Sequence, residues 1–144
     1  MAVKEKSYRG FTYSYDLGKV KVAKPIPKKM GKIARKWLDK FDLSKVELML
    51  IGKDRYDPLS SGSAFSLCKG EEVLSTSNLD RIRQRDFDFV CIMMENDADG
   101  NLFKNRDKME RIVLGELVHI AYPETIGNRH KTDNMVAEIL ESTS

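Results

Sequence analysis

Two ionisable side chains lie within an otherwise apolar segment of this chain, and they are its first candidates for chemistry. The segment R-I-V-L-G-E-L-V-H-I, residues 111–120, contains the carboxylate of Glu116 and the imidazole of His119. A helix over this segment is apolar on most of its circumference, so both groups are expected to be buried. Burial without partners is expensive for either group. We therefore expect Glu116 and His119 to interact with each other, with a metal ion or with a ligand.

A known zinc motif differs from this segment at one position. The letters G-E-L-V-H match H-E-x-x-H except at the first, and in that motif two histidines on one helix face bind zinc while the glutamate activates a water. Gly115 stands where the first histidine would be. Glycine inside a helix costs about 1 kcal/mol relative to alanine. The position has therefore lost a side chain that pointed into a cleft, or it lets a backbone or ligand approach closely.

A complete zinc site needs more than this segment provides. Catalytic zinc normally has three protein ligands and a water. His119 and His130, the only two histidines of the chain, supply two. The third ligand would be Glu116, which would remove the general base, or Asp133, one turn beyond His130 if the last helix starts there. His119, His130 and Asp133 would form a two-histidine, one-carboxylate site that zinc accepts, with Glu116 kept as the base.

Length and composition limit the class of protein. The 144 residues are expected to form one domain, 1–144, and 41% hydrophobic with 33% charged residues is typical of a soluble globular protein. No apolar run reaches the roughly 18 to 20 residues that span a membrane. The first eight residues, M-A-V-K-E-K-S-Y, have no apolar signal core, which favours a cytoplasmic location. Cys68 and Cys91 are isolated from each other and from histidine, which favours reduced core thiols over a nucleophile.

The net charge of +3 hides an asymmetry along the chain. Residues 1–45 contain 13 Lys and Arg against 4 acidic residues, a balance of +9, and the remaining 99 residues carry −6. A basic N-terminal third is suited to nucleic acid or to an acidic protein partner. The alternative is a lysine-rich solvated surface, because no aromatic-basic nucleic-acid signature accompanies it.

The pattern of apolar residues predicts an α+β fold with a small mixed or antiparallel sheet. The expected elements are a basic hairpin over 8–24 with its turn at D-L-G, an amphipathic helix over 28–41, strands over 46–51, 64–70 and 87–95, and helices over 103–122 and 131–141. The stretch 71–85 is ambiguous between a short capped helix and an irregular connection. The strand over 87–95 ends in a continuous apolar run, as a strand does when both faces are covered.

The order of these elements resembles that of the small zinc metallopeptidases of phages and archaea, and more distantly of the SprT-like and other zincins. The resemblance rests on D-F-D-F-V-C-I-M-M-E, the acidic loop after it, E-L-V-H, the Tyr-Pro loop and a later lone histidine, within roughly residues 80–140; the site region is 86–140. It implies a zincin-like fold with a buried HExxH-type helix, and zinc as the cofactor. It also implies that Glu116 is the general base, His119 a helix ligand and His130 the downstream ligand. Gly115 departs from the family pattern.

Three interpretations follow from these residues. In the first, the chain is a zincin-like domain with a degenerate G-E-x-x-H motif and without ordinary peptidase activity. In the second, it is an active zinc peptidase that cuts an extended peptide lying along the strand over 87–95, contacted by Phe89, Cys91 and Met93. In the third, Glu116 and His119 are only a buried pair. A binding module for peptide or nucleic acid is compatible with the first.

Overall fold

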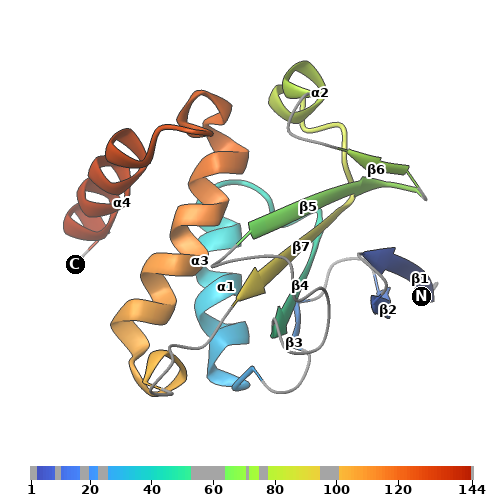
Figure 1. Ribbon diagram of the computed structural model, residues 1–144, viewed down its shortest axis with the longest axis horizontal. Helices are drawn as coiled ribbons and strands as arrows, with labels where there is room; N and C mark the ends of the chain where they lie inside the picture. The colour runs from blue at the N-terminus through green and yellow to red at the C-terminus, as the bar shows by residue number, and fades with distance from the viewer. Residues whose placement is uncertain are drawn as a thin grey trace.

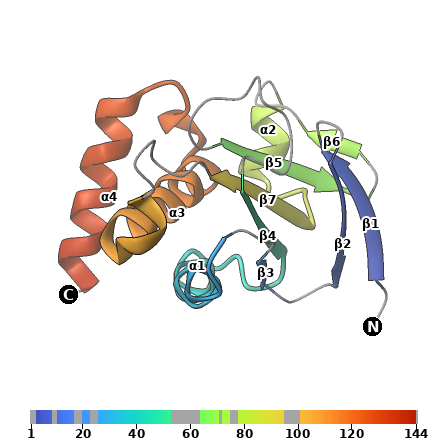
Figure 2. The same cartoon turned by 60° about the horizontal axis from the view of Figure 1, so that its bottom comes forward.

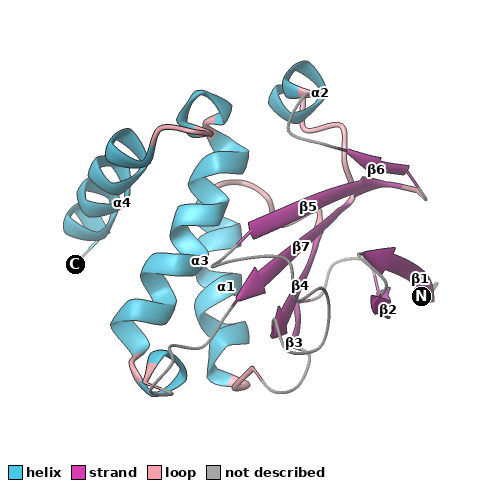
Figure 3. Ribbon diagram, in the orientation of Figure 1, coloured by secondary structure: helices cyan, strands magenta, loops and turns pink. Residues whose placement is uncertain are grey.

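The computed structural model describes residues 3–8, 11–16, 20–22, 26–52, 64–70, 72–74, 78–94 and 101–143. These residues form a mixed α+β structure in which helices cover a sheet (Figures 1 and 3). The strands of the main sheet are β3 (Val20–Val22), β4 (Glu47–Gly52), β5 (Ala64–Lys69), β6 (Glu72–Leu74) and β7 (Phe89–Met94). The α-helices are α1 (Lys29–Lys40), α2 (Leu79–Arg83), α3 (Arg106–Ala121) and α4 (Arg129–Thr143).

The main sheet has the strand order β3-β4-β7-β5-β6. Strands β3, β4 and β7 are parallel, with Val22 opposite Leu50 and Leu50 opposite Ile92. Strand β5 is antiparallel to β7, and β6 is antiparallel to β5. The consequence for the site is that β7, which leads towards α3, lies inside the sheet with a neighbouring strand along each edge.

The predicted hairpin over 8–24 is wrong in its pairing. Strands β1 (Val3–Tyr8) and β2 (Phe11–Asp16) form a separate antiparallel pair in which Tyr8 lies opposite Phe11. In the turn expected at D-L-G, Asp16 ends β2 and Leu17 and Gly18 fall outside the described residues, while β3 beyond them joins the main sheet in parallel with β4. Parallel neighbours need a crossover connection, and α1 provides one between β3 and β4.

Both faces of the central strands are buried. Leu48, Leu50, Val90, Ile92 and Met94 pack in one cluster with residues of α1 and α3. The alternate residues of β4 and β7 point to the other face and are buried as well: Met49, Ile51, Phe89, Cys91 and Met93. Cys68 and Cys91 are both buried and free. This burial explains why β7 is apolar at consecutive positions.

Helices α1 and α3 lie side by side on one face of the sheet, and α4 lies on the outer side of α3 (Figure 2). The buried residues of α1 are Met30, Ile33, Ala34, Trp37 and Leu38. Glu110 of α3 joins the two helices, because its Oε2 accepts a hydrogen bond from Trp37 Nε1 at 2.8 Å and lies 3.4 Å from Lys36 Nζ. This carboxylate fixes the position of α3 beside α1.

Local signals set the ends of α3. Asn105 caps its start, since the Asn105 side chain accepts a hydrogen bond from the Lys108 amide at 3.1 Å. Pro123 follows its end and begins a 3₁₀ turn, η3 (Pro123–Thr125). Among the described residues, no helix is both long and apolar enough to cross a membrane.

Candidate pocket between α3 and α4

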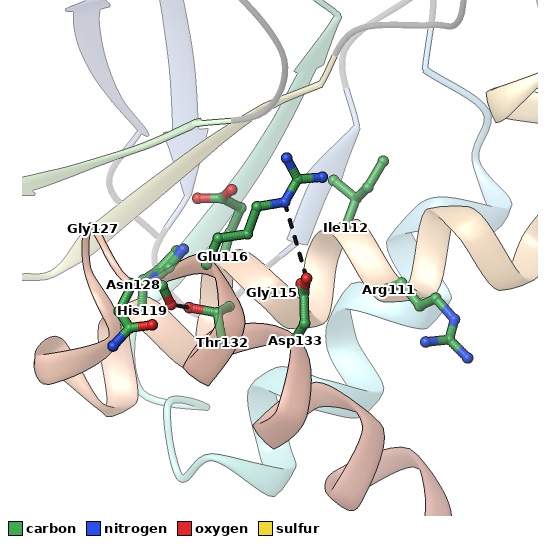
Figure 4. A pocket seen from close by; sticks show the side chains of 10 residues that line it. Arg111, Ile112, Gly115, Glu116, His119, Gly127, Asn128, Thr132 and Asp133 are labelled. Carbon is green, nitrogen blue, oxygen red and sulfur yellow. Dashed lines mark hydrogen bonds and ion pairs between the residues drawn. The ribbon is translucent and has the colours of Figure 1, made fainter.

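A pocket of about 610 Å³ lies between α3, the start of α4 and the loop that joins them (Figure 4). Its lining residues on α3 are Arg111, Ile112, Gly115, Glu116 and His119. The lining residues from the loop and α4 are Gly127, Asn128, Arg129, Thr132 and Asp133. The spacing of the α3 residues by three and four puts them on one helix face. The ionisable residues singled out in the apolar segment therefore share this pocket.

Glu116 and His119 differ in burial within the pocket. Only 7% of Glu116 is exposed, whereas His119 is half-buried. Burial lowers the pKa of His119 below its usual value, because removal from water disfavours the charged imidazolium. The imidazole is therefore neutral at neutral pH, which is the form that accepts a proton or binds a metal.

Two residues hold the His119 ring. Its Nδ1 lies 3.0 Å from Thr125 Oγ1, and Phe65 of β5 stacks on it with ring centroids 6.2 Å apart and an interplanar angle of 29°. Sequence reasoning did not identify Thr125 or Phe65. The available signal for Thr125 was Pro123, which ends the helix and starts a tight turn that brings the chain back towards His119. Phe65 comes from a distant strand and had no local signal.

The predicted zinc ligands are not all brought together. Asp133 lines the same pocket as His119, but its side chain is 70% exposed and pairs with Arg129 at 3.9 Å. His130 is exposed, lies outside the pocket lining, and has its Nε2 3.3 Å from Asn134 Nδ2. One residue along a helix is a rotation of about 100°, so His130 points sideways from the face that Arg129 and Asp133 present. Within the described ranges, no group of three His, Cys, Asp or Glu is arranged to hold a metal ion.

Gly115 leaves open space in the pocket wall. A Cβ atom built at this position would meet no heavy atom within 4 Å. Of the two explanations offered by the sequence, close approach of a backbone to Gly115 is therefore not observed among the described residues. The absent side chain leaves room next to Glu116 and His119, as Figure 4 shows for the three labelled residues.

The residues of β7 that were expected to contact a peptide are buried in the core. Phe89, Cys91 and Met93 are each 0% exposed, and β7 is paired with β4 on one edge and β5 on the other. A peptide has no free edge on β7. The outer edge nearest His119 belongs to β5, where β6 pairs with residues 67–69 but no described strand pairs with 64–66. Phe65 lies within that uncovered stretch.

Comparisons of the chain with protein-family models, with curated proteins and with solved structures found no match.

Proposed function

We propose that this chain is a zincin-like domain whose α3–α4 pocket binds an extended peptide and which lacks ordinary zinc peptidase activity. The observation that carries the proposal is that Glu116, His119 and the bare Gly115 line one pocket, in the order that H-E-x-x-H would present them. In the H-E-x-x-H motif, this helix face carries two zinc ligands and a general base. Here it carries one imidazole, one carboxylate and open space at Gly115.

The donor set supports a binding role over ordinary hydrolysis. Zinc in a peptidase needs three protein ligands, and it would polarise the scissile carbonyl and activate a water. The set His119, His130 and Asp133 does not fit that requirement here, because His130 is turned towards Asn134. We therefore derive no hydrolytic step through zinc. The alternative is an active peptidase that uses those three ligands with Glu116 as base, and it requires His130 to turn into the pocket.

The edge of β5 suggests how a peptide would be held. On the edge of β5 away from β7, no described strand pairs with residues 64–66, and an extended peptide can add to such an edge through its own main chain. Phe65 joins this edge to His119 by ring stacking. A peptide along β5 would therefore run past the mouth of the pocket, so its side chain or main-chain N–H groups would reach His119.

Restoring the absent histidine tests this proposal. Positions 115 and 119 are one helical turn apart and line the same pocket, so Gly115→His would present two imidazoles on one face. Structural zinc in zinc-finger peptides has a binding free energy of about 10–16 kcal/mol, which is about 3 kcal/mol for each of four ligands. We therefore expect zinc affinity to rise on the order of a hundredfold over the wild type. Isothermal titration with zinc measures this change.

Two variants control for effects of packing at position 115. Gly115→Ala fills the open space without adding a ligand and is expected to raise the free energy of unfolding by about 1 kcal/mol with no change in zinc affinity. The double variant Gly115→His with His119→Gln should lose the gain. If Gly115→His binds zinc no better than Gly115→Ala, the zincin-like geometry is wrong. Stoichiometric zinc in the wild-type chain would instead support the active peptidase.

A basic surface on α1 supports binding of nucleic acid as a second function. The first turn of α1 has no acidic residue, and Lys28, Lys29 and Lys32 are exposed. Within residues 22, 26–51, 65–70, 72, 74, 78–94 and 101–143, whose side-chain exposure is described, Tyr122 is the only exposed large hydrophobic side chain. Protein partners usually need an apolar patch, whereas nucleic-acid interfaces are polar and strongly positive. The phosphate backbone of nucleic acid is therefore the better match for this surface.

Replacing these three lysines by glutamine is expected to weaken binding to DNA and to reduce its salt dependence. Each phosphate that the variant no longer neutralises should reduce the slope of log K against log salt by about 0.9. Lys36 is left unchanged, because it pairs with Glu110 and lies 4.6 Å from the Trp37 ring centroid. Fluorescence anisotropy of labelled DNA at several salt concentrations provides the measurement.

The matched control for charge removes three exposed lysines outside α1: Lys45, Lys104 and Lys131. An equal loss of DNA affinity in both triple variants would show a general effect of net charge and exclude a specific surface on α1. Absence of DNA binding by the wild type would exclude this second function altogether.

A further inference from the structure

The Thr125 hydroxyl lies between the His119 ring and a main-chain carbonyl. Thr125 Oγ1 donates a hydrogen bond to Tyr122 O at 2.8 Å, and it lies 3.0 Å from His119 Nδ1. A hydroxyl has one proton to donate and can accept on its lone pairs. With that proton on Tyr122 O, the hydroxyl accepts from the ring, and Nδ1 then carries a hydrogen.

The position of Thr125 is fixed by further hydrogen bonds. Thr125 is 0% exposed, and its amide also donates a hydrogen bond to Tyr122 O at 2.9 Å. Its carbonyl accepts from the Asn128 amide at 2.9 Å and from Thr132 Oγ1 of α4 at 3.2 Å. These bonds hold the Thr125 side chain within reach of both Tyr122 O and the His119 ring.

A neutral imidazole with a hydrogen on Nδ1 has a bare lone pair on Nε2. In the part of the chain that the structure describes, the one hydrogen bond of the His119 ring is made by Nδ1. Thr125 is not part of the pocket lining, whereas His119 is. The ring nitrogen left for a ligand in the pocket is therefore Nε2, in its acceptor form.

We propose that Thr125 is a positioning residue that holds His119 as the Nδ1–H tautomer, so that the pocket recognises a hydrogen-bond donor of its ligand. The proposed tautomer is argued from the hydrogen bonds of Thr125, while the assignment of the donor to a main-chain or side-chain N–H of a peptide rests on the proposed function. A ligand that offers only acceptors at this point, such as a carboxylate, would face the lone pair and be disfavoured.

Nitrogen NMR of the imidazole rings tests the tautomer without any ligand. The chain has two histidines, so spectra of protein labelled with ¹⁵N in histidine contain two rings, and a His130→Gln variant assigns them. At a pH where both rings are neutral, we expect a protonated-type Nδ1 signal and a bare-type Nε2 signal for His119.

Substitution of Thr125 separates positioning from packing. Thr125→Val removes the acceptor at nearly equal volume and should shift the tautomer ratio of His119 by about fivefold or more towards Nε2–H, the change expected for one net hydrogen bond. Thr125→Ser keeps the hydroxyl and should restore the wild-type ratio. If the valine variant does not fold, the wild-type spectrum still decides the question, because an Nε2–H signal for His119 would overturn the proposal. An unchanged ratio in folded Thr125→Val would overturn it as well.

Recognition of a hydrogen-bond donor by His119 is tested separately, by peptide titration. Titration of the wild-type chain with an extended peptide should move the His119 Nε2 signal, whereas acetate in place of the peptide should leave it unchanged. The expected tautomer without any peptide binding would leave Thr125 as the positioning residue and refute the proposed peptide function. A response to acetate that equals the response to peptide would refute donor recognition.

Discussion

The Trp37→Ala variant is expected to lose about 3–5 kcal/mol of its free energy of unfolding. Trp37 is 0% exposed in the cluster between α1 and the sheet, so truncation removes a large apolar area and leaves a cavity. It also removes the donor that Glu110 Oε2 accepts from at 2.8 Å. A small domain has a total stability of about 5–15 kcal/mol, so this variant is expected to be close to unfolded at physiological temperature.

Trp37→Phe separates the two contributions in that variant. It keeps a smaller aromatic ring in the core and removes the indole N–H, so a loss of about 1.5–3 kcal/mol is expected for the hydrogen bond to a charged acceptor, in addition to the cost of the cavity left by the smaller ring. Urea denaturation followed by circular dichroism gives both values, since Trp37 is the only tryptophan and the fluorescence signal is lost with it. A loss below about 1 kcal/mol in Trp37→Ala would contradict the packing of α1 described above.

Phe89→Ala is expected to destabilise the fold by about 3–5 kcal/mol and to have no separate effect on a ligand. The sequence suggested that Phe89 contacts a substrate, but the residue is 0% exposed in the central strand. Removing its ring leaves a cavity on the face of β7 opposite α3. Denaturant unfolding measures the loss, and peptide titration under conditions where the variant is folded measures the affinity.

Phe65→Ala is the matched control for that substitution. Phe65 is partly exposed at the edge of the sheet and stacks on His119, so its truncation should cost less stability and should weaken peptide binding. The opposite pattern, in which Phe89→Ala is nearly neutral for stability and weakens the peptide, would restore the substrate role for β7.

The sequence predicted best those elements whose signal is local. The helix expected over 103–122 corresponds to Arg106–Ala121, and the strand expected over 87–95 corresponds to Phe89–Met94. Both contain a continuous apolar run, and the helix has clear end signals at Asn105 and Pro123. The mixed α+β class follows from the same signals.

The parts that were wrong or missed depend on pairing between distant segments. The D-L-G turn was a reasonable local signal, but the partner of β3 is β4, which is reached only through α1. The direction of His130 depends on where α4 begins, and α4 starts at Arg129 rather than at the expected residue 131. His130 is therefore a residue of the helix and not of the loop before it, so the helix geometry sets the direction of its side chain. Phe65 and Thr125 reach His119 only after the sheet and the η3 turn have formed.

The hydrogen bond from Thr132 to the carbonyl of Thr125 has a consequence for the dynamics of the pocket. Helix α4 buries Thr132 and Val136 and packs Met135, Ile139 and Leu140 partly buried against the core, so we expect it to detach from α3 at a lower free energy than global unfolding. Each detachment releases the turn that orients the imidazole and removes one wall of the pocket. Amide hydrogen exchange in α4 therefore reports the opening of the pocket. A ligand in the pocket contacts only the first turns of α4, but it should slow exchange along the whole helix.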